Sequence, residues 1–180
     1  MELDIVKFFN RLWRGTAVDR VTGFVNRRLY LAVFWTALTI GIFFWAGNGR
    51  VIAITMGVAA GLHFAITEGV FKYLLDRHLN KVRPYIAHPD KIFPIGRMFS
   101  DSSFPSSHMS ANLAPLAVLW YFYPAIWPVA VAWVLITAYT RLHSGMHYPS
   151  DIAAGAVLGM AYGISAVYLV NYFFNCYVLS

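Results

Sequence analysis

Long hydrophobic runs alternate with polar segments along most of this chain. A helix needs about 20 apolar residues to cross the hydrocarbon of a bilayer, and five runs are candidates: Leu29–Gly47, Val51–Leu75, Met109–Tyr123, Ala125–Tyr139 and Ile152–Phe174. Each run is predicted to be a helix, because lipid offers no hydrogen-bond partner to an unpaired backbone group. The pattern therefore predicts an all-α integral membrane bundle of about five transmembrane helices.

A different periodicity precedes the first run. Leu3, Val6, Phe9 and Trp13 recur at helical spacing, with charged residues between them. This pattern is typical of an amphipathic helix that lies in the membrane interface. Residues 1–28 are therefore expected to form an interfacial segment, and residues 29–180 a single transmembrane domain.

The order of the runs gathers the polar segments on one side of the membrane. Five crossings place the N-terminal segment, the polar insertion Asp76–Pro105 and the 141–150 loop on the same face. The opposite face receives the 47–50 and 122–126 turns and the C-terminus. Any polar chemistry is expected at the first face.

Composition supports a membrane protein and limits its partners. Hydrophobic residues make up 59% of the chain and charged residues 12%, against about 25% charged residues in a typical soluble domain. The net charge of +6 favours anionic lipid headgroups or an anionic substrate over nucleic acid. The one cysteine, Cys176, excludes an intramolecular disulfide and a cysteine-based zinc site.

Two motifs lie in the polar insertion and at its end. "NKVRPY" contains Lys81 and Arg83, and "SSFPSSHMSAN" covers residues 102–112. Pro105 and the serines are typical of a helix start. They place His108 in a first helical turn, beside backbone N–H groups that attract an anion.

The third motif, "TRLHSGMHYPSD", covers residues 140–151. Arg141 ends one run, His147 lies in the turn, and Asp151 is expected at the third position of the next helix. The spacing permits the Asp151 carboxylate to hold one imidazole nitrogen of His147 and to leave the other free and basic. His143 is assigned to the loop surface or to the edge of a substrate site.

In this order on one membrane face, the three motifs resemble the type 2 phosphatidic acid phosphatase (PAP2) family. The family usually has glycine where Ser107 stands, and a lysine seven residues before Arg83 where this chain has an aspartate. Lys72 and Lys81 are the two candidates for that missing cation. The resemblance implies that residues 29–180 are a catalytic domain of the membrane lipid phosphatase branch.

The residues and the resemblance together predict phosphoryl transfer without a metal or cofactor. His147 attacks phosphorus to give a phosphohistidine, Asp151 orients His147, and His108 protonates the departing lipid oxygen. The groups expected to hold the phosphoryl oxygens are Arg83, Arg141, Ser106, Ser107, Lys81 and Lys72. The expected partners are a lipid phosphate substrate and membrane lipids, with no protein partner and no nucleic acid.

Two other classes fit parts of the pattern: a vanadate-dependent haloperoxidase-like enzyme, and a small membrane transporter or structural protein. The substrate stays open between undecaprenyl diphosphate, phosphatidic acid, phosphatidylglycerol phosphate and lipid A 1-phosphate. A bacterial-type cytoplasmic membrane is expected. The concentration of basic residues on the polar face favours a cytoplasmic site, whereas the resemblance implies an extracytoplasmic one, which is the orientation we expect.

Overall fold

The computed structural model of the protein describes residues 1–178, and the side chains of Asp76 and of residues 175–178 lie outside that description. The described chain is helical, without a strand. Its helices are α1 (Glu2–Arg11), α2 (Ala17–Val25), α3 (Arg28–Trp45), α4 (Gly49–Leu62), the π-helix η1 (His63–Leu74), α5 (Asp76–Leu79), α6 (Pro84–Ala87), α7 (Ser107–Phe122), the 3₁₀-helix η2 (Pro124–Ile126), α8 (Trp127–His143) and α9 (Pro149–Val178).

Four helical segments of the described chain are long and apolar enough to cross a membrane: Arg28–Trp45, Gly49–Leu74, Pro124–His143 and Pro149–Phe174. The fifth member of the bundle, α7, has 16 residues and is therefore about 24 Å long, shorter than the roughly 30 Å hydrocarbon layer. It continues through Pro115, and 12 of its residues are buried. The all-α membrane bundle is confirmed, with α7 as its short inner helix.

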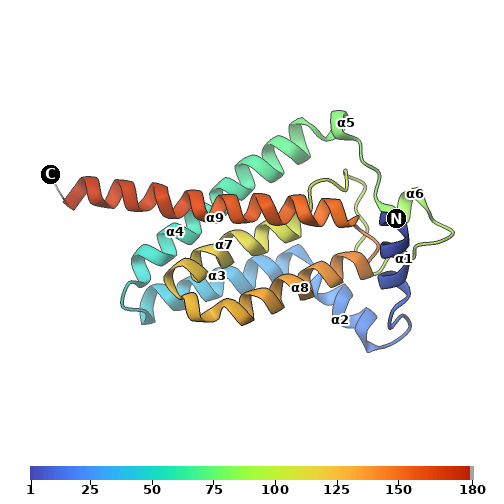
Figure 1. Cartoon of the computed structure of the whole chain (residues 1–180), viewed down its shortest axis with the longest axis horizontal. Helices are drawn as coiled ribbons and strands as arrows, with labels where there is room; N and C mark the ends of the chain where they lie inside the picture. The colour runs from blue at the N-terminus through green and yellow to red at the C-terminus, as the bar shows by residue number, and fades with distance from the viewer. Residues whose placement is uncertain (179–180) are drawn as a thin grey trace.

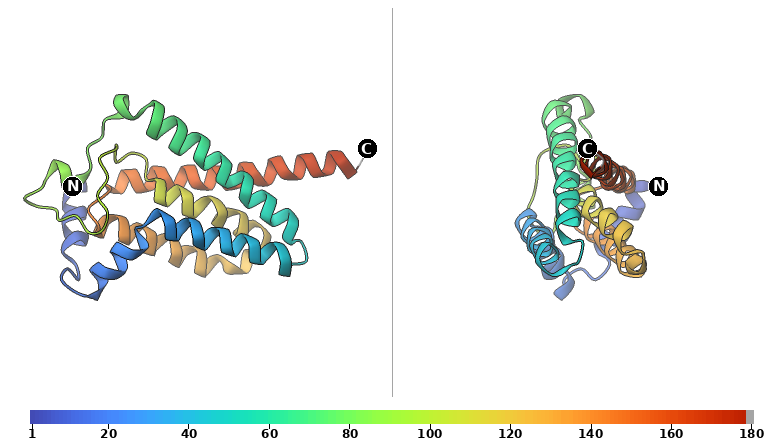
Figure 2. Two further views of the ribbon diagram at one scale, coloured as in Figure 1. Left: turned by 180° about the vertical axis from the view of Figure 1, so that it is seen from behind. Right: turned by 90° about the vertical axis from the view of Figure 1, so that its left-hand side faces the viewer.

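The polar segments meet at one end of the bundle, as expected. Figure 1 shows α1, α6 and the loop before α7 at the same end as the connection between α8 and α9. The α3–α4 and α7–α8 turns and the C-terminal end of α9 lie at the other end, and the view from behind agrees (Figure 2). The three sequence motifs therefore come from segments that are neighbours in space.

Helices α7 and α9 form the most extensive contact of the bundle, and glycines of α9 permit it. A Cβ atom at Gly159 or Gly163 would lie 2.8 or 2.6 Å from a backbone oxygen of α7, and one at Gly155 would lie 2.5 Å from that of Ser106, the residue before the helix. These glycines repeat every fourth residue and so occupy one face of the helix, where small residues let two membrane helices approach closely. We call this contact the glycine seam; it joins the two helices that carry His108 and Asp151.

The N-terminal segment is attached to the polar end by buried hydrogen bonds. The Asn10 side chain donates to the carbonyl oxygens of Phe93 (2.8 Å) and His143 (2.7 Å), and it accepts from the Phe93 N–H (2.9 Å). His143 is fully buried, with its ring nitrogens 2.9 Å from the Phe9 carbonyl oxygen and 3.0 Å from an Asp19 oxygen. The expected surface position of His143 was therefore wrong: this histidine fastens α1 and α2 to the end of α8.

Candidate active site

The position of His147 depends on a tight turn after α8. Gly145 has φ +69°, a left-handed conformation that terminates many helices and that glycine adopts without steric cost. A Cβ atom there would also lie 2.5 Å from a methyl carbon of Ile92. The turn sends the chain back over the polar end of the bundle and buries His147, which is 3% exposed.

The two imidazole nitrogens of His147 have different partners. Nδ1 lies 2.8 Å from the carbonyl oxygen of Ser103, and because a carbonyl can only accept, Nδ1 carries a proton. Nε2 lies 3.4 Å from a terminal nitrogen of Arg83 and is the basic nitrogen of the neutral ring. The ring is therefore presented as a nucleophile through Nε2.

Asp151 has a different contact from the one that its spacing predicted. Its carboxylate is 4.0 Å from His147 Nδ1, beyond hydrogen-bond distance. One oxygen instead accepts from the Tyr148 N–H (2.8 Å) and the other from Lys81 Nζ (2.6 Å). Asp151 is the third residue of α9, from which an acidic side chain reaches back to the N–H of the capping residue. The Tyr148 N–H at the start of α9 thus binds the carboxylate oxygen that we expected to bind the His147 imidazole.

The predicted first-turn position of His108 in α7 is confirmed, and its ring is buried. Its Nε2 lies 3.0 Å from the carbonyl oxygen of Asn26, so this nitrogen donates and Nδ1 remains for a reacting group. Ser106 precedes the helix as its N-cap residue, and its N–H donates to the Asp151 carbonyl oxygen (3.0 Å). The hydroxyls of Ser106 and Ser107 are buried without a hydrogen-bond partner.

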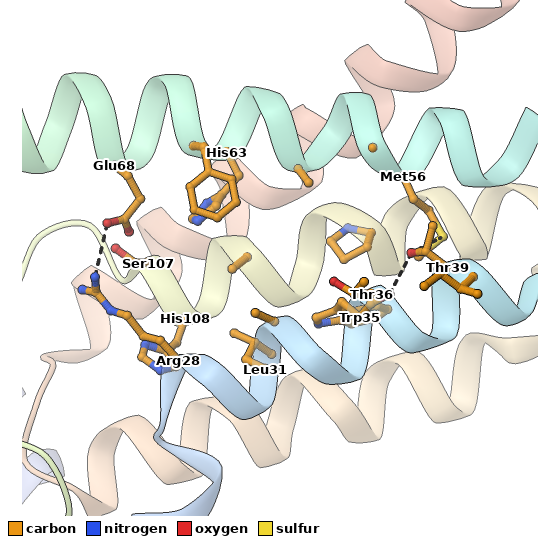
Figure 3. A pocket seen from close by; sticks show the side chains of 17 residues that line it. Arg28, Leu31, Trp35, Thr36, Thr39, Met56, His63, Glu68, Ser107 and His108 are labelled. Atoms are coloured by element: carbon orange, nitrogen blue, oxygen red, sulfur yellow. Dashed lines mark hydrogen bonds and ion pairs between the residues drawn. The ribbon is translucent and has the colours of Figure 1, made fainter.

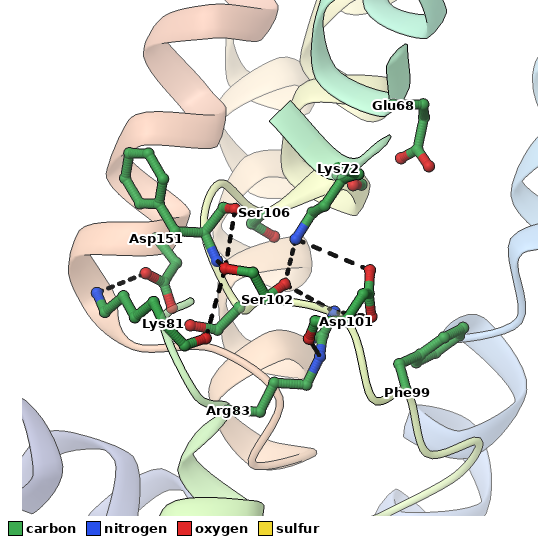
Figure 4. A network of polar contacts seen from close by, with 12 residues as sticks. Glu68, Lys72, Lys81, Arg83, Phe99, Asp101, Ser102, Ser106 and Asp151 are labelled. Atoms are coloured by element: carbon green, nitrogen blue, oxygen red, sulfur yellow. Dashed lines mark hydrogen bonds and ion pairs between the residues drawn. The ribbon is translucent and has the colours of Figure 1, made fainter. Parts of the chain in front are cut away.

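Arg83 is fixed by its loop, as Figure 4 shows. Its guanidinium donates to the Asp101 carboxylate (2.8 Å) and to the carbonyl oxygens of Asp101 (3.0 Å) and Met146 (3.2 Å). Lys72 donates to the Ser102 carbonyl oxygen and lies 3.9 Å from the Asp101 carboxylate. These contacts hold Arg83 rigidly beside His147.

Arg141 is buried as Arg83 is, but one of its guanidinium nitrogens is left without a partner. The side chain is 2% exposed, and its Nε atom has no hydrogen-bond partner. A buried guanidinium nitrogen without a partner is costly, and an anion bound beside it would remove that cost.

A small polar pocket brings the predicted residues together. It is lined by Arg28, Arg83, Phe99, Ser107, His108, Arg141, Met146 and His147. Its volume is about 10 Å³, room for about one water molecule, so a phosphoryl group enters only if side chains move. Arg28 is the most exposed of the pocket's three arginines, with a side chain 45% exposed, and it can swing aside.

The predicted site residues divide into two groups. Arg83, Ser107, His108, Arg141 and His147 line the pocket. Ser106, Asp151 and both candidate lysines lie behind these residues: Lys81 pairs with Asp151, and Lys72, from η1, donates to the loop that holds Arg83.

The charge of His147 follows from this setting. Burial, reinforced by the guanidinium groups of Arg83 and Arg141, holds the pKa of His147 well below its usual range. Because a lowered pKa favours the neutral ring, His147 stays unprotonated, as a nucleophile requires.

An apolar groove adjoins the polar pocket. It has a volume of about 370 Å³ and runs between α3, the α4–η1 helix and α7 (Figure 3). Leu31, Trp35, Met56 and Phe64 are among its walls, and it shares Arg28, Ser107 and His108 with the pocket. A polar head and an apolar chain of one molecule could therefore occupy the two hollows together.

Sequence reasoning missed four contributors to this site. They are the backbone carbonyls of Asn26 and Ser103, the Asp101 carboxylate, and Arg28. The two carbonyls could not be found from the sequence, because every residue has one. Arg28 could have been found, because it lies directly before the first span, on the face where the motifs gather.

Comparison with known proteins identifies the family of the chain. Residues 52–175 match the model of the PAP2 superfamily, which is more than half of the chain. The chain belongs to the PAP2 superfamily. Two similar relatives are a lipid A 4'-phosphatase of Bacteroides thetaiotaomicron, 24% identical over 88% of this chain and 72% of the relative, and the undecaprenyl-diphosphatase BcrC of Bacillus subtilis, 30% identical over 91% of this chain and 81% of the relative.

Solved PAP2-type structures share the fold. LpxE of Aquifex aeolicus superposes with a TM-score of 0.72 at 20% identity, over 92% of this chain and 94% of that protein. A transmembrane PAP2-type phosphatidylglycerolphosphate phosphatase of Bacillus subtilis superposes with a TM-score of 0.60 at 19% identity, over 97% and 84%. With the four spanning helices, these likenesses make the protein an integral membrane member of the superfamily.

Proposed function

We propose that this protein is a membrane lipid phosphatase that removes a terminal phosphate from a lipid phosphate or diphosphate through a phosphohistidine. The observation that carries the proposal is the polar pocket. Two histidine side chains and three guanidinium groups line it, and an apolar groove adjoins it. The PAP2 relatives named as lipid A and undecaprenyl-diphosphate phosphatases support the same chemistry.

In the first half-reaction, His147 Nε2 attacks phosphorus and the bond from phosphorus to the leaving oxygen breaks. His108 begins this step as an imidazolium: it gives the proton on Nδ1 to that oxygen and becomes neutral, while its Nε2 proton stays hydrogen-bonded to the Asn26 carbonyl. Arg83 and Arg141, with the N–H groups at the start of α7, hold the three equatorial oxygens on which charge develops.

In the second half-reaction, His108 takes a proton from water, which attacks the phosphohistidine and releases inorganic phosphate. The Ser103 carbonyl keeps the proton on Nδ1 of His147 through both steps. Asp151 stabilises the imidazolium from 4.0 Å and acts mainly by fixing the turn that carries His147.

The proposal is tested by phosphate release from lipid phosphates presented in detergent micelles. His147→Ala and His108→Ala should each lower kcat by at least about 10²–10⁴-fold, the usual contribution of an acid–base or nucleophilic group. His78→Ala, at an exposed position of α5, is the matched control and should keep wild-type activity.

A chelator distinguishes the mechanism from a metal-dependent one. We expect EDTA to leave the wild-type rate unchanged, because the pocket is lined by cationic side chains that would repel a metal ion. A loss of activity in EDTA that added magnesium reverses would contradict the mechanism. Full activity of His147→Ala would contradict the assignment of the nucleophile.

We also propose that the protein lies in a bacterial-type cytoplasmic membrane with its site on the extracytoplasmic face. Residues 1–28 would form the interfacial segment and residues 29–180 the catalytic domain. Exposed apolar side chains on α1 and α2, such as Phe8 (62%) and Phe24 (53%), support contact of that segment with lipid.

A further inference from the structure

The polar pocket and the apolar groove meet at three residues, and this junction narrows the substrate class. Arg28, Ser107 and His108 line both hollows. A substrate with its reacting phosphate beside His147 and its chain beside Leu31 and Trp35 must pass this junction. The atoms that follow the scissile bond would therefore pass Arg28, one of the residues that Figure 3 shows lining the groove.

Arg28 has only loose ion pairs among the described residues. Its guanidinium nitrogens lie 3.5 Å from a Glu68 oxygen and 3.8 Å from an Asp101 oxygen, longer than the 2.7–2.9 Å typical of a charge-assisted hydrogen bond. Asp101 is also engaged by Arg83 at 2.8 Å. The Arg28 side chain, which stacks over Phe99, is therefore available to a stronger anion.

A monophosphate ester would use this cation poorly. Arg83 and Arg141 already hold the reacting phosphoryl group, and the atoms that pass Arg28 would be an uncharged ester oxygen and the first carbons of the lipid. A lipid over Arg28 would then remove water from a charge that only the long ion pairs with Glu68 and Asp101 offset, which is unfavourable. In a lipid diphosphate, the inner phosphate occupies this place, and a guanidinium matches its oxygens.

We propose that Arg28 binds the inner phosphate of a lipid diphosphate and so selects diphosphates over monophosphates. The inference rests on the proposed phosphatase function. His147 Nε2 bonds to the outer phosphorus, the bond from this phosphorus to the bridging oxygen breaks, and the lipid monophosphate leaves with that oxygen. Water then cleaves the phosphohistidine to inorganic phosphate and neutral His147.

The experiment compares two substrates of equal chain length, farnesyl diphosphate and farnesyl monophosphate, with purified full-length protein. Wild type should prefer the diphosphate in kcat/KM. Arg28→Gln should lower kcat/KM for the diphosphate about 10-fold or more beyond its effect on the monophosphate, the size expected for one charge-assisted hydrogen bond. Arg28→Lys, which keeps the charge and loses the planar fork, should fall between the two proteins.

Arg27→Gln is the matched control. Arg27 is the neighbouring residue, its guanidinium contacts the Tyr30 hydroxyl, and it lines neither hollow. The wild-type substrate preference should survive in this variant. A loss in Arg28→Gln that is equal for both substrates, or a wild type without preference, overturns the inference.

The same experiment separates failure of the inference from failure of the proposed function. If both substrates are hydrolysed in a reaction that needs His147, and Arg28→Gln affects both equally, the proposed phosphatase function stands and the diphosphate subsite is rejected. Wild-type protein that hydrolyses neither substrate, nor any other lipid phosphate, rejects the function itself. Thermal unfolding in detergent at the wild-type temperature confirms that Arg28→Gln is folded.

Discussion

His147 lies between a carbonyl oxygen and two guanidinium groups, and its protonation can be measured. Its lowered pKa means that the folded protein releases this proton more readily than the unfolded chain. This group's contribution to stability is therefore unfavourable below the unfolded pKa of about 6.5 and vanishes as pH rises above it. The nucleophile stays neutral into mildly acidic solution.

We expect the His147 resonance of histidine-labelled protein in micelles to titrate well below pH ~6.5, the ordinary histidine value. His147→Gln identifies the resonance by its disappearance. A midpoint for His147 at or above pH ~6.5 would contradict the neutral nucleophile.

At the residue scale, the sequence predicted which side chains gather but not all of their contacts. His108, Arg141 and His147 were recognisable because their residue types and order carry the chemistry. The partner of His147 Nδ1 was not, because that partner is the backbone carbonyl of Ser103 and every residue has such a carbonyl. Asp151 was expected on the imidazole because spacing along the chain cannot distinguish a helix cap from a side-chain pair.

At the scale of helices, the glycine seam sets the distance between the two halves of the site. Because α7 begins beside His108 and α9 begins just after His147, a shift of α9 would move one histidine relative to the other. The Gly155, Gly159 and Gly163 repeat was visible in the sequence, but the helix it faces was not, because the same small-residue pattern fits any helix neighbour.

Gly159→Ala should therefore impair both stability and catalysis. Its methyl group would lie 2.8 Å from the Ser110 carbonyl oxygen, and such overpacking typically costs about 1–3 kcal/mol of unfolding free energy. Displacement of a reacting group by about 1 Å can cost about 10²-fold in rate. Thermal unfolding in detergent and phosphate release measure the two effects.

Gly61→Ala is the control for the seam, because a Cβ atom at this position of α4 meets nothing within 4 Å. It should leave stability and activity close to wild type. Equal behaviour of the two variants would show that the seam does not set the geometry of the site.

For the whole molecule, the hydrophobic pattern predicted the membrane bundle and the single polar end, since both depend on chain order and apolar length. It did not predict that the short helix α7 is buried inside the bundle, because burial by other helices depends on packing rather than on composition. The structure also changes the argument about orientation. Arg28 lines the pocket and Arg14 stacks over Phe93, so both cations have local roles that are independent of the side of the membrane.

Orientation can be measured with single cysteines after Cys176, whose side chain lies outside the described residues, is replaced by serine. Asn80 is exposed at the polar end, and Asn48 is exposed in the turn at the opposite end. With the site on the extracytoplasmic face, an impermeant maleimide should label Asn80→Cys in intact cells and Asn48→Cys only after lysis. The reverse pattern would place the site in the cytoplasm.

The junction of groove and pocket also determines where the two products go. The groove is bordered by lipid-facing side chains such as Ile40 (53% exposed) and Phe64 (64% exposed), whereas the pocket lies beneath the polar loops. The dephosphorylated lipid can diffuse away within the bilayer while inorganic phosphate returns to water, so neither product obstructs the exit of the other. Turnover should consequently follow the mole fraction of substrate in the membrane rather than its bulk concentration, and dilution with inert lipid should slow it.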